Sequence, residues 1–415
     1  MYHCSYPTTQ TASRLAMAVR DDRTRSLSTI SQRSTACQQP FPEELHSRFG
    51  NGGSSLWGYN RFCSMIHSST MPSTVLVTGA NGYIGNAVAR AFSRAGWITY
   101  GLVRSESAVR SLQLEEILPV LGQIDDIDSH SAILHQLPKT LDAIVSTTEN
   151  LDDYITHHKN TIQLLRTLSL ASGRHGVRPL VIVSSGCKDY GIGPHYHGDR
   201  DLKPHTEESP LNPPDPVSKR ANMSLEIFKN SDAFAPVLVR PTNVYGRSAS
   251  YYRGFFEVAV LAKKQSLPLQ IPVSPASICH ALHVDDCGDA YVALAAHPRR
   301  AEIEGGIFNI SGREYETVNQ IARALVAEYD LAGVEYVNSE DVGPVGKAWP
   351  PMLIDFPQWT GSNKIREITG WRDMRPLFSD TVGLYRRAYE AAVETGHENI
   401  AKMVKREKML PRQHK

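Results

Sequence analysis

The sequence predicts an α/β protein built on a doubly wound parallel sheet, followed by a smaller mixed C-terminal domain. Two observations support this prediction. An apolar run at residues 75–77 leads directly into Gly79, Gly82 and Gly85, and a helical pattern follows these glycines. Further along, short apolar runs alternate with helical patterns, which is typical of parallel strands joined by right-handed crossovers. The expected core is therefore Rossmann-type.

The stretch "TGANGYIG", residues 78–85, joins the first strand to the first helix. Ile84, Val88 and Phe92 recur every four residues on one helix face, and Gly96 can end the helix. Such a turn lets the backbone approach a pyrophosphate, which the free N–H groups at the helix start can bind. The expected dinucleotide contacts in this stretch are Gly79, Asn81, Gly82, Tyr83, Ile84 and Gly85.

Later strands end at further polar or special residues. The runs "WITYGLVRS", "LPVLGQIDD", "LDAIVSTT", "PLVIVSS" and "PVLVRPTNVYG" are expected to be the second to sixth strands. In doubly wound sheets the ligand lies at the carboxyl ends of the strands. These ends add Arg104, Ile124, Ser184, Pro241 and Asn243 to the expected cofactor contacts.

Arg104 bears on the choice of cofactor. An acidic residue at the end of the second strand would bind the ribose 2′-OH of NAD, whereas a guanidinium can hold the 2′-phosphate of NADP. The sequence therefore favours NADP. NAD stays open, because an exposed arginine can lie beside either cofactor.

Composition limits the other readings. The 415 residues carry 44 Lys plus Arg and 43 Asp plus Glu, a balance that favours neither nucleic acid nor a membrane surface as partner. The six cysteines lack metal-type spacing and indicate a reduced, cytoplasmic protein.

An Arg- and Ser-rich leader, 1–70, is expected to be a disordered extension, with mitochondrial targeting as the alternative. The other expected parts are the dinucleotide domain at 71–245, the substrate domain at 246–400 and a basic, frayed tail at 401–415.

Residues 73–395 resemble the extended short-chain dehydrogenase/reductase family, of the NAD-dependent epimerase/dehydratase type. The resemblance rests on "TGANGYIG", Asn160, "SSGCKDYG", "RPTNVYG", "LHVDD", "FNISG" and "SNKIREITGW", in this order. It implies a substrate domain over the nicotinamide end of the cofactor. It also implies a catalytic Ser or Thr, a Tyr acting as acid/base, and a Lys four residues later that orients the nicotinamide ribose.

The match to these catalytic positions is incomplete. Ser185 is expected to supply the hydroxyl, although alignment on "YG" would place Gly186 there. Lys219 matches the ribose-binding lysine, but Asp215 stands where the tyrosine belongs. Tyr190 is a candidate to supply a phenol instead, with a structural role as the alternative.

The remaining candidates divide between chemistry and packing. Tyr251 and Tyr252 could provide a phenol or line the pocket. Cys187 is expected to be a packing residue. Lys188 and Asp189 are expected to belong to a solvated loop. The histidines of "HYHGDRDLKPH" are not expected to bind a metal.

Two functions remain open at this point. One is an NAD(P)-dependent oxidoreductase or epimerase, and the other is an NADP-binding sensor without turnover. Relatives place an arginine where Cys279 stands, to hold a diphosphate, so a small non-nucleotide carbonyl or hydroxyl compound is the expected substrate. A homodimer is left open.

Overall fold

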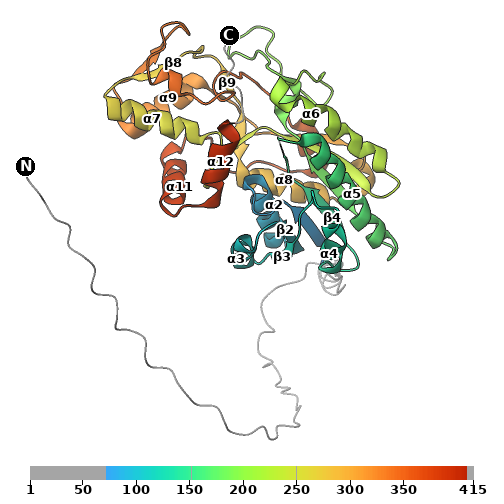
Figure 1. Ribbon diagram of the computed structural model, residues 1–415. Coiled ribbons are helices and arrows are strands. Elements are labelled where there is room, and N and C mark those ends of the chain that lie inside the picture. Colours follow the sequence, from blue (N-terminus) through green and yellow to red (C-terminus); the bar gives the residue numbers. More distant parts are fainter. Residues whose placement is uncertain (1–71, 151, 249, 409–415) are drawn as a thin grey trace, which may run out of the picture. The chain divides into compact units, whose positions relative to one another are not determined.

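The computed structural model describes residues 72–150, 152–248 and 250–408 (Figure 1). These residues belong to one compact unit, Thr70–Lys415. The expectations for residues 1–70 lie outside the described residues.

A seven-stranded sheet forms the centre of this unit, in the order β11-β6-β5-β4-β1-β2-β3. Every neighbouring pair in it is parallel. The strands are β1 (Thr74–Thr78), β2 (Ile98–Val103), β3 (Leu118–Leu121), β4 (Ala143–Ser146), β5 (Leu180–Ser184), β6 (Ala235–Pro241) and β11 (Ile307–Ile310). The strand order reverses between β1 and β4, which is the topological switch point where ligands bind in such sheets. The predicted doubly wound sheet is confirmed.

Helices cover both faces of the sheet because its strands are apolar on both sides. Val75 and Val77 of β1 pack into one core with α2, α3, α8 and α10, whereas Leu76 packs into the opposite core with α4 and α5. The helices are α2 (Tyr83–Arg94), α3 (Val109–Leu114), α4 (Ser129–His135), α5 (Tyr154–Gly173), α6 (Asp215–Met223), α8 (Val284–Ala295) and α10 (Asn363–Thr369). The 3-10 turns are η1 (Glu106–Ala108), η2 (Cys187–Tyr190), η3 (Ser224–Asn230), η4 (Arg300–Glu302) and η5 (Gly346–Ala348).

A second core, rich in aromatic residues, forms beyond the sheet. Phe255, Phe378 and Tyr245 pack together in it. Its elements are α7 (Arg253–Gln265), α9 (Val318–Tyr329), α11 (Val382–Glu394) and the short pairs β8 (Leu269–Ile271) with β13 (Val334–Tyr336) and β9 (Ile278–Cys279) with β12 (Glu316–Thr317). β7 (Asn243–Tyr245) pairs with β10 (Ala281–His283) and leads from the sheet into this part. Thr317 caps α9 in a capping box with Gln320, near the start predicted from the sequence.

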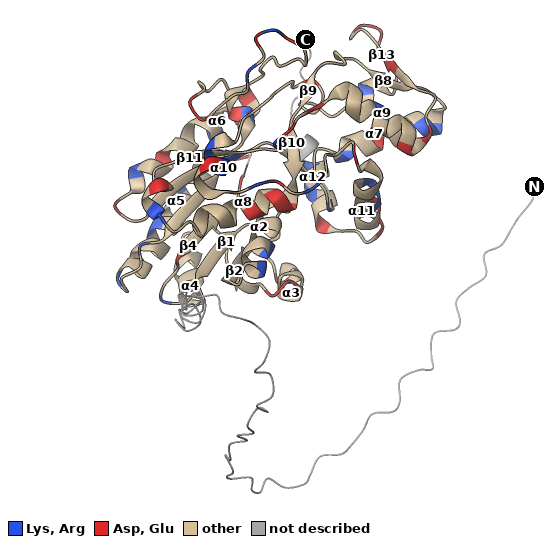
Figure 2. Cartoon of the chain, turned by 180° about the vertical axis from the view of Figure 1, so that it is seen from behind, with Lys and Arg blue, Asp and Glu red and all other residues tan. Residues whose placement is uncertain are grey.

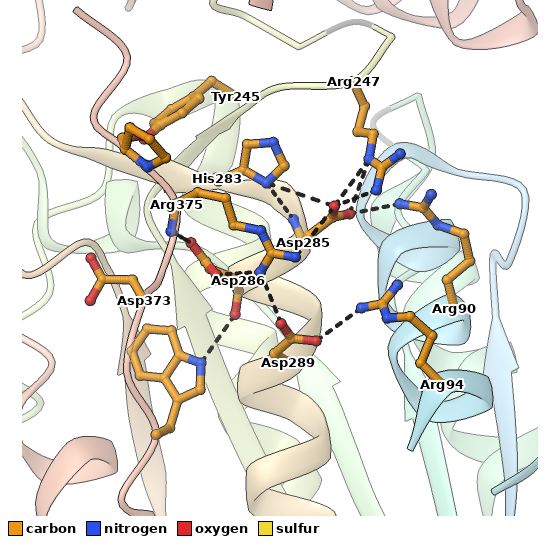
Figure 3. Close-up of polar contacts among 12 residues, drawn as sticks. Arg90, Arg94, Tyr245, Arg247, His283, Asp285, Asp286, Asp289, Asp373 and Arg375 are labelled. Carbon is orange, nitrogen blue, oxygen red and sulfur yellow. Dashed lines mark hydrogen bonds and ion pairs between the residues drawn. The ribbon is translucent and has the colours of Figure 1, made fainter. Parts of the chain in front are cut away.

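An ionic cluster joins α8 to α2 and to two loops (Figure 3). Asp285 pairs with Arg90 of α2 at 2.7 Å and with Arg247 from the loop after β7. Asp286 pairs with Arg375 at 2.6 Å. Both aspartates lie in the first turn of α8, and Figure 2 shows acidic positions on α8 beside α2. The cluster holds the loop after β7, which borders the candidate site, against the sheet layer.

No helix within residues 72–408, apart from the two undescribed positions, is long and apolar enough to cross a membrane.

Candidate functional site

A cavity of about 640 Å³ lies at the carboxyl ends of the central strands. Its size is within the range of small-molecule and cofactor sites. Nearly all of the residues expected to contact a dinucleotide line it: Gly79, Asn81, Gly82, Tyr83, Ile84, Gly85, Arg104, Ile124, Ser184, Pro241 and Asn243. The cavity continues past them to Ser185, Lys188 and Gln358.

The glycine-rich turn has the geometry of a phosphate cradle. Gly79 has φ of +70°, and a Cβ on Gly85 would lie 2.2 Å from the carbonyl oxygen of Gly79, so neither position tolerates a side chain. Helix α2 starts at Tyr83, and no side chain caps its first N–H groups. These groups face a cavity and lack a partner from a cap, which is what a pyrophosphate would supply. The residues present therefore fit a dinucleotide.

Arg104 and Ile124 lie at the sheet edge formed by β2 and β3. Ile124 is buried, whereas Arg104 is exposed, and no hydrogen bond or ion pair of Arg104 is found in the part of the chain that the structure describes. Its guanidinium is thus available to a phosphate. Asp125, also in the cavity wall, instead bonds His157 at 2.7 Å.

The two serines after β5 are already engaged. Ser184 Oγ lies 2.7 Å from the Tyr291 hydroxyl, and Ser185 Oγ donates to the carboxylate of Asp189. In this arrangement the Ser185 proton points to Asp189, so the oxygen of Ser185 offers its lone pairs to the cavity rather than a donor.

A buried ionic network supports this end of the cavity. Asp189 is fully buried and accepts from Arg220 at 2.7 Å, and Arg240 lies 3.6 Å from its other oxygen. Arg220 also pairs with Glu149 at 3.4 Å. Burial disfavours the charge of Arg220, but Asp189 and Glu149 outweigh it and hold the pKa of Arg220 above its ordinary value. Asp189 is thus part of a structural ion network, not of a solvated loop.

Helix α6 presents a different face from the one that the sequence suggests. Val217 and Arg220 are buried and line the cavity, while Asp215 and Lys219 are exposed and do not. Residues one position apart on a helix point about 100° away from each other. Because α6 docks through positions three apart, 217 and 220, Lys219 is turned out of the cavity, and the expected role of Lys219 is corrected.

Tyr190 also lies away from the cavity lining. Its hydroxyl donates to Asn309 Oδ1 at 2.8 Å and accepts from Arg240 at 3.0 Å, in the buried interior. A phenol that is enclosed in this way has no access to a ligand, which corrects its place among the catalytic candidates. Tyr252 is likewise buried in the aromatic core, whereas Tyr251 lines the cavity.

Lys188 is the residue whose environment differs most from the sequence expectation. Its amino group donates to the carbonyl of Met352 at 2.9 Å and lies 4.1 Å from the centre of the Phe356 ring. Burial lowers the pKa of Lys188 to about 8, against the opposing charge of Asp355. A signal for it was present, since Lys188 lies in η2, the turn that follows β5, but its sequence neighbours gave no sign of burial.

Cys187 and His195 are both hydrogen-bonded to backbone carbonyl groups. The thiol of Cys187 is buried and donates to the carbonyl of Arg240, and burial raises the pKa of Cys187. His195 bonds the carbonyl of Lys203 at 2.9 Å. Among residues 72–408, excluding positions 151 and 249, no group of three His, Cys, Asp or Glu is placed to hold a metal ion.

The C-terminal segment contributes to the cavity as well. Helix α12 (Glu398–Lys408) places Asn399, Lys402, Met403 and Lys405 in the cavity wall. The expectation of a frayed basic tail from residue 401 is therefore corrected as far as Lys408. The spacing of residues 399, 402 and 403 on one helix face is the sequence signal that would have indicated this.

Comparison with known proteins identifies the family. A model of the NAD dependent epimerase/dehydratase family matches residues 75–311, which is more than half of the 415 residues. The chain belongs to this family. The epimerase/dehydratase match covers all seven strands except the first residue of β1, and it ends after β11.

Individual relatives carry names of nucleotide-sugar enzymes and of one subunit. The chain is 32% identical to UDP-arabinose 4-epimerase 1 of Arabidopsis thaliana over 41% of this chain and 43% of that protein. It is 28% identical to UDP-glucose 4-epimerase of Mycolicibacterium smegmatis over 72% and 92%. It is 25% identical to methionine adenosyltransferase 2 subunit beta of Xenopus laevis over 68% and 81%.

Solved structures of this family share the fold. The structure of dTDP-glucose 4,6-dehydratase from Bacillus anthracis str. Ames, in complex with NAD, aligns with a TM-score of 0.59 at 17% identity. The alignment covers 78% of this chain and 98% of that one.

Proposed function

We propose that this epimerase/dehydratase-family protein is an NADP-preferring oxidoreductase or epimerase that acts on a small, non-nucleotide carbonyl or hydroxyl compound. The observation that carries the proposal is one continuous cavity, which joins the glycine-rich turn to a pocket end lined by Ser185, Lys188 and Gln358. Such a cavity can hold a dinucleotide and a substrate together, which hydride transfer requires.

The preference for NADP rests on Arg104. It lies at the end of β2, lines the cavity, and is followed by Ser105 rather than by a carboxylate. The 2′-phosphate of NADP would give this guanidinium a charge-assisted partner. The same cationic position would gain little from the 2′-OH of NAD.

Lys188 is proposed to exchange the proton in place of the missing tyrosine. A bound nicotinamide would supply hydride acceptance and donation. The neutral amine of Lys188 removes the proton from a substrate hydroxyl, and its ammonium form returns a proton to a carbonyl oxygen. A pKa of about 8 suits both directions near neutral pH. Arg220 stays charged and can orient a polar substrate group.

The substrate proposal rests on the pocket end near Lys188. Cys279 is buried near Lys188 but outside the cavity wall, and burial raises its pKa to about 12, so this position offers no cation to a diphosphate. A compact carbonyl or hydroxyl compound fits this end better than a UDP- or dTDP-sugar.

The test combines binding and turnover. NADPH and NADH binding is measured by fluorescence, and NADPH oxidation is followed against a panel of small ketones and aldehydes, with UDP-glucose included. Tight NADPH binding with oxidation by a small carbonyl is expected. Epimerisation of UDP-glucose at the higher rate would contradict the substrate proposal.

A second candidate is an NADP-binding regulator without turnover. The outward position of Lys219 and the absence of a tyrosine at Asp215 favour it. So does the relative whose name is that of a subunit of an adenosyltransferase. Tight NADPH binding with no oxidation across the panel would support this candidate over the first.

A further inference from the structure

Helix α12 crosses the candidate dinucleotide site although it follows that site by some 300 residues in the chain. Lys402 Nζ donates to the backbone carbonyl of Asn81, in the glycine-rich turn, at 2.8 Å. Asn81 in turn donates to Glu398 at 3.2 Å. Both Lys402 and Lys405 line the cavity from α12, and Lys402 reaches the glycine-rich turn. In Figure 1 this helix follows α11 and lies close to α2.

The attachment of α12 to the rest of the protein is polar. Besides its contacts with Asn81, it is held by Asn399, which donates to Ser248 at 3.2 Å. Of residues 398–405, whose side chains the structure describes, none belongs to a hydrophobic core. Each such hydrogen bond contributes only about 1 kcal/mol. A helix held this way can leave its place at low cost, as a lid must.

The connection to α11 has the form of a hinge. Gly396 lies between the two helices with φ of +63°, and no atom of the described residues lies within 4 Å of where its Cβ would be. A residue with free space and wide conformational range can absorb the backbone rotation of a moving helix.

We propose that α12 is a lid over the dinucleotide site and that Lys402 and Lys405 bind the phosphates of the bound dinucleotide. The proposal rests on the proposed dinucleotide-dependent function. Lys402 exchanges the Asn81 carbonyl for a phosphate oxygen, and Lys405 approaches from the next turn of the same helix. The N–H groups of α2 bind the phosphates from one side only. The two lysine charges would stabilise the phosphates from the opposite side, where α12 lies.

Binding by charge variants tests the proposal. The double variant Lys402→Met with Lys405→Met keeps the side-chain length and removes both charges. Its Kd for NADPH, measured by calorimetry, is expected to rise at least roughly tenfold, the scale for losing a charge-assisted hydrogen bond. The matched control is Lys139→Met, at an exposed position before β4 and outside the cavity wall. Its Kd is expected to equal that of the unaltered protein.

Limited proteolysis separates the lid from a purely electrostatic effect. NADPH is expected to slow tryptic cleavage after Arg406 in the unaltered protein, and not in the double variant, which keeps this cleavage site. An unchanged Kd for NADPH in the double variant, or a cleavage rate of the unaltered protein that does not depend on NADPH, would contradict the lid proposal. Neither result would contradict the proposed function. Failure of the unaltered protein to bind any pyridine dinucleotide would overturn both.

Discussion

Lys188 and Arg220 bring two cations to the substrate end of the cavity, and their partners give them different properties. Arg220 has two carboxylates, Asp189 and Glu149, and keeps its charge. Lys188 has a carbonyl and a ring as partners, and no ion pair of Lys188 is found among the described residues. A largely desolvated lysine titrates nearer neutrality, whereas an arginine keeps its charge. Only Lys188 is therefore suited to proton exchange.

Replacing Lys188 by Met should lower turnover by about a hundredfold, the usual scale for losing a general acid/base, while NADPH affinity stays the same. In the unaltered protein, alcohol oxidation needs the neutral amine, so its rate should rise with pH through about 8. Carbonyl reduction needs the ammonium form and should fall over the same range. Steady-state rates from pH 6 to 10 check this, and the exposed Lys219→Met is the control. If Lys188→Met left the pH profile unchanged, Lys188 would not be the group that exchanges the proton.

Replacing Arg104 by Asp should reverse the cofactor preference. The aspartate would repel the 2′-phosphate of NADP and could bond the 2′-OH of NAD. Loss of the charge-assisted contact should cost about 2 kcal/mol, or roughly thirtyfold in NADP affinity. Calorimetric titration with both cofactors measures the two affinities. If the variant bound NADP as tightly as the unaltered protein, Arg104 would not be a ligand of the 2′-phosphate.

At the scale of elements, the glycine-rich turn that joins β1 to α2 is too closely packed to accept added side chains. Gly79 O lies where a side chain on Gly85 would be, and Thr147 Oγ1 would lie 2.6 Å from the same Cβ. The strand, the turn and the first helical turn are consequently one unit, and α2 cannot move away without losing its packing against α8.

Gly85→Ala should therefore abolish measurable dinucleotide binding and lower the melting temperature, because the added methyl group displaces the phosphate cradle. Gly173→Ala is the matched control. A Cβ there meets no atom of the described part of the chain within 4 Å, and alanine favours the last turn of α5. If Gly85→Ala bound NADPH as the unaltered protein does, the turn would not be the phosphate site.

For the molecule as a whole, the ionic cluster around α8 links the sheet layer to the loops of the C-terminal part (Figure 3). Burial disfavours the charge of Asp285, but Arg247 and Arg90 outweigh it and leave its pKa below the ordinary value. Since the folded pKa is depressed, the carboxylate stabilises the fold above its unfolded pKa. That contribution is lost as the pH falls through the folded value.

Asp285→Asn should accordingly destabilise the protein by about 2 kcal/mol at pH 7, because it leaves two arginines without their shared counter-charge. The difference from the unaltered protein should shrink below about pH 4, where aspartates protonate. Urea unfolding at several pH values measures it. Asp232→Asn, which breaks an exposed and solvent-screened pair with Arg166, should lower the free energy of unfolding clearly less. A loss of equal size in both variants would argue against a special role of the cluster.

Local features of the chain were enough to predict the fold and the cofactor end of the cavity. The strand, the glycines and the helix of residues 74–94 are contiguous, so their geometry follows from backbone preferences within that stretch. The alternation of apolar runs and helical patterns likewise determined the parallel sheet, and with it the edge where Arg104, Ser184 and Asn243 meet.

The substrate end and the lid were decided only by tertiary structure. Lys188 packs against Met352 and Phe356, far along the chain, and burial is the main cause of its lowered pKa. Which face of α6 points inward depends on how the helix docks. As a result Arg220 lines the cavity, and its sequence neighbour Lys219 does not. Lys402 meets Asn81 across 321 residues of sequence. Burial, docking angle and long-range contact are properties of the packed chain, and no local pattern carries them.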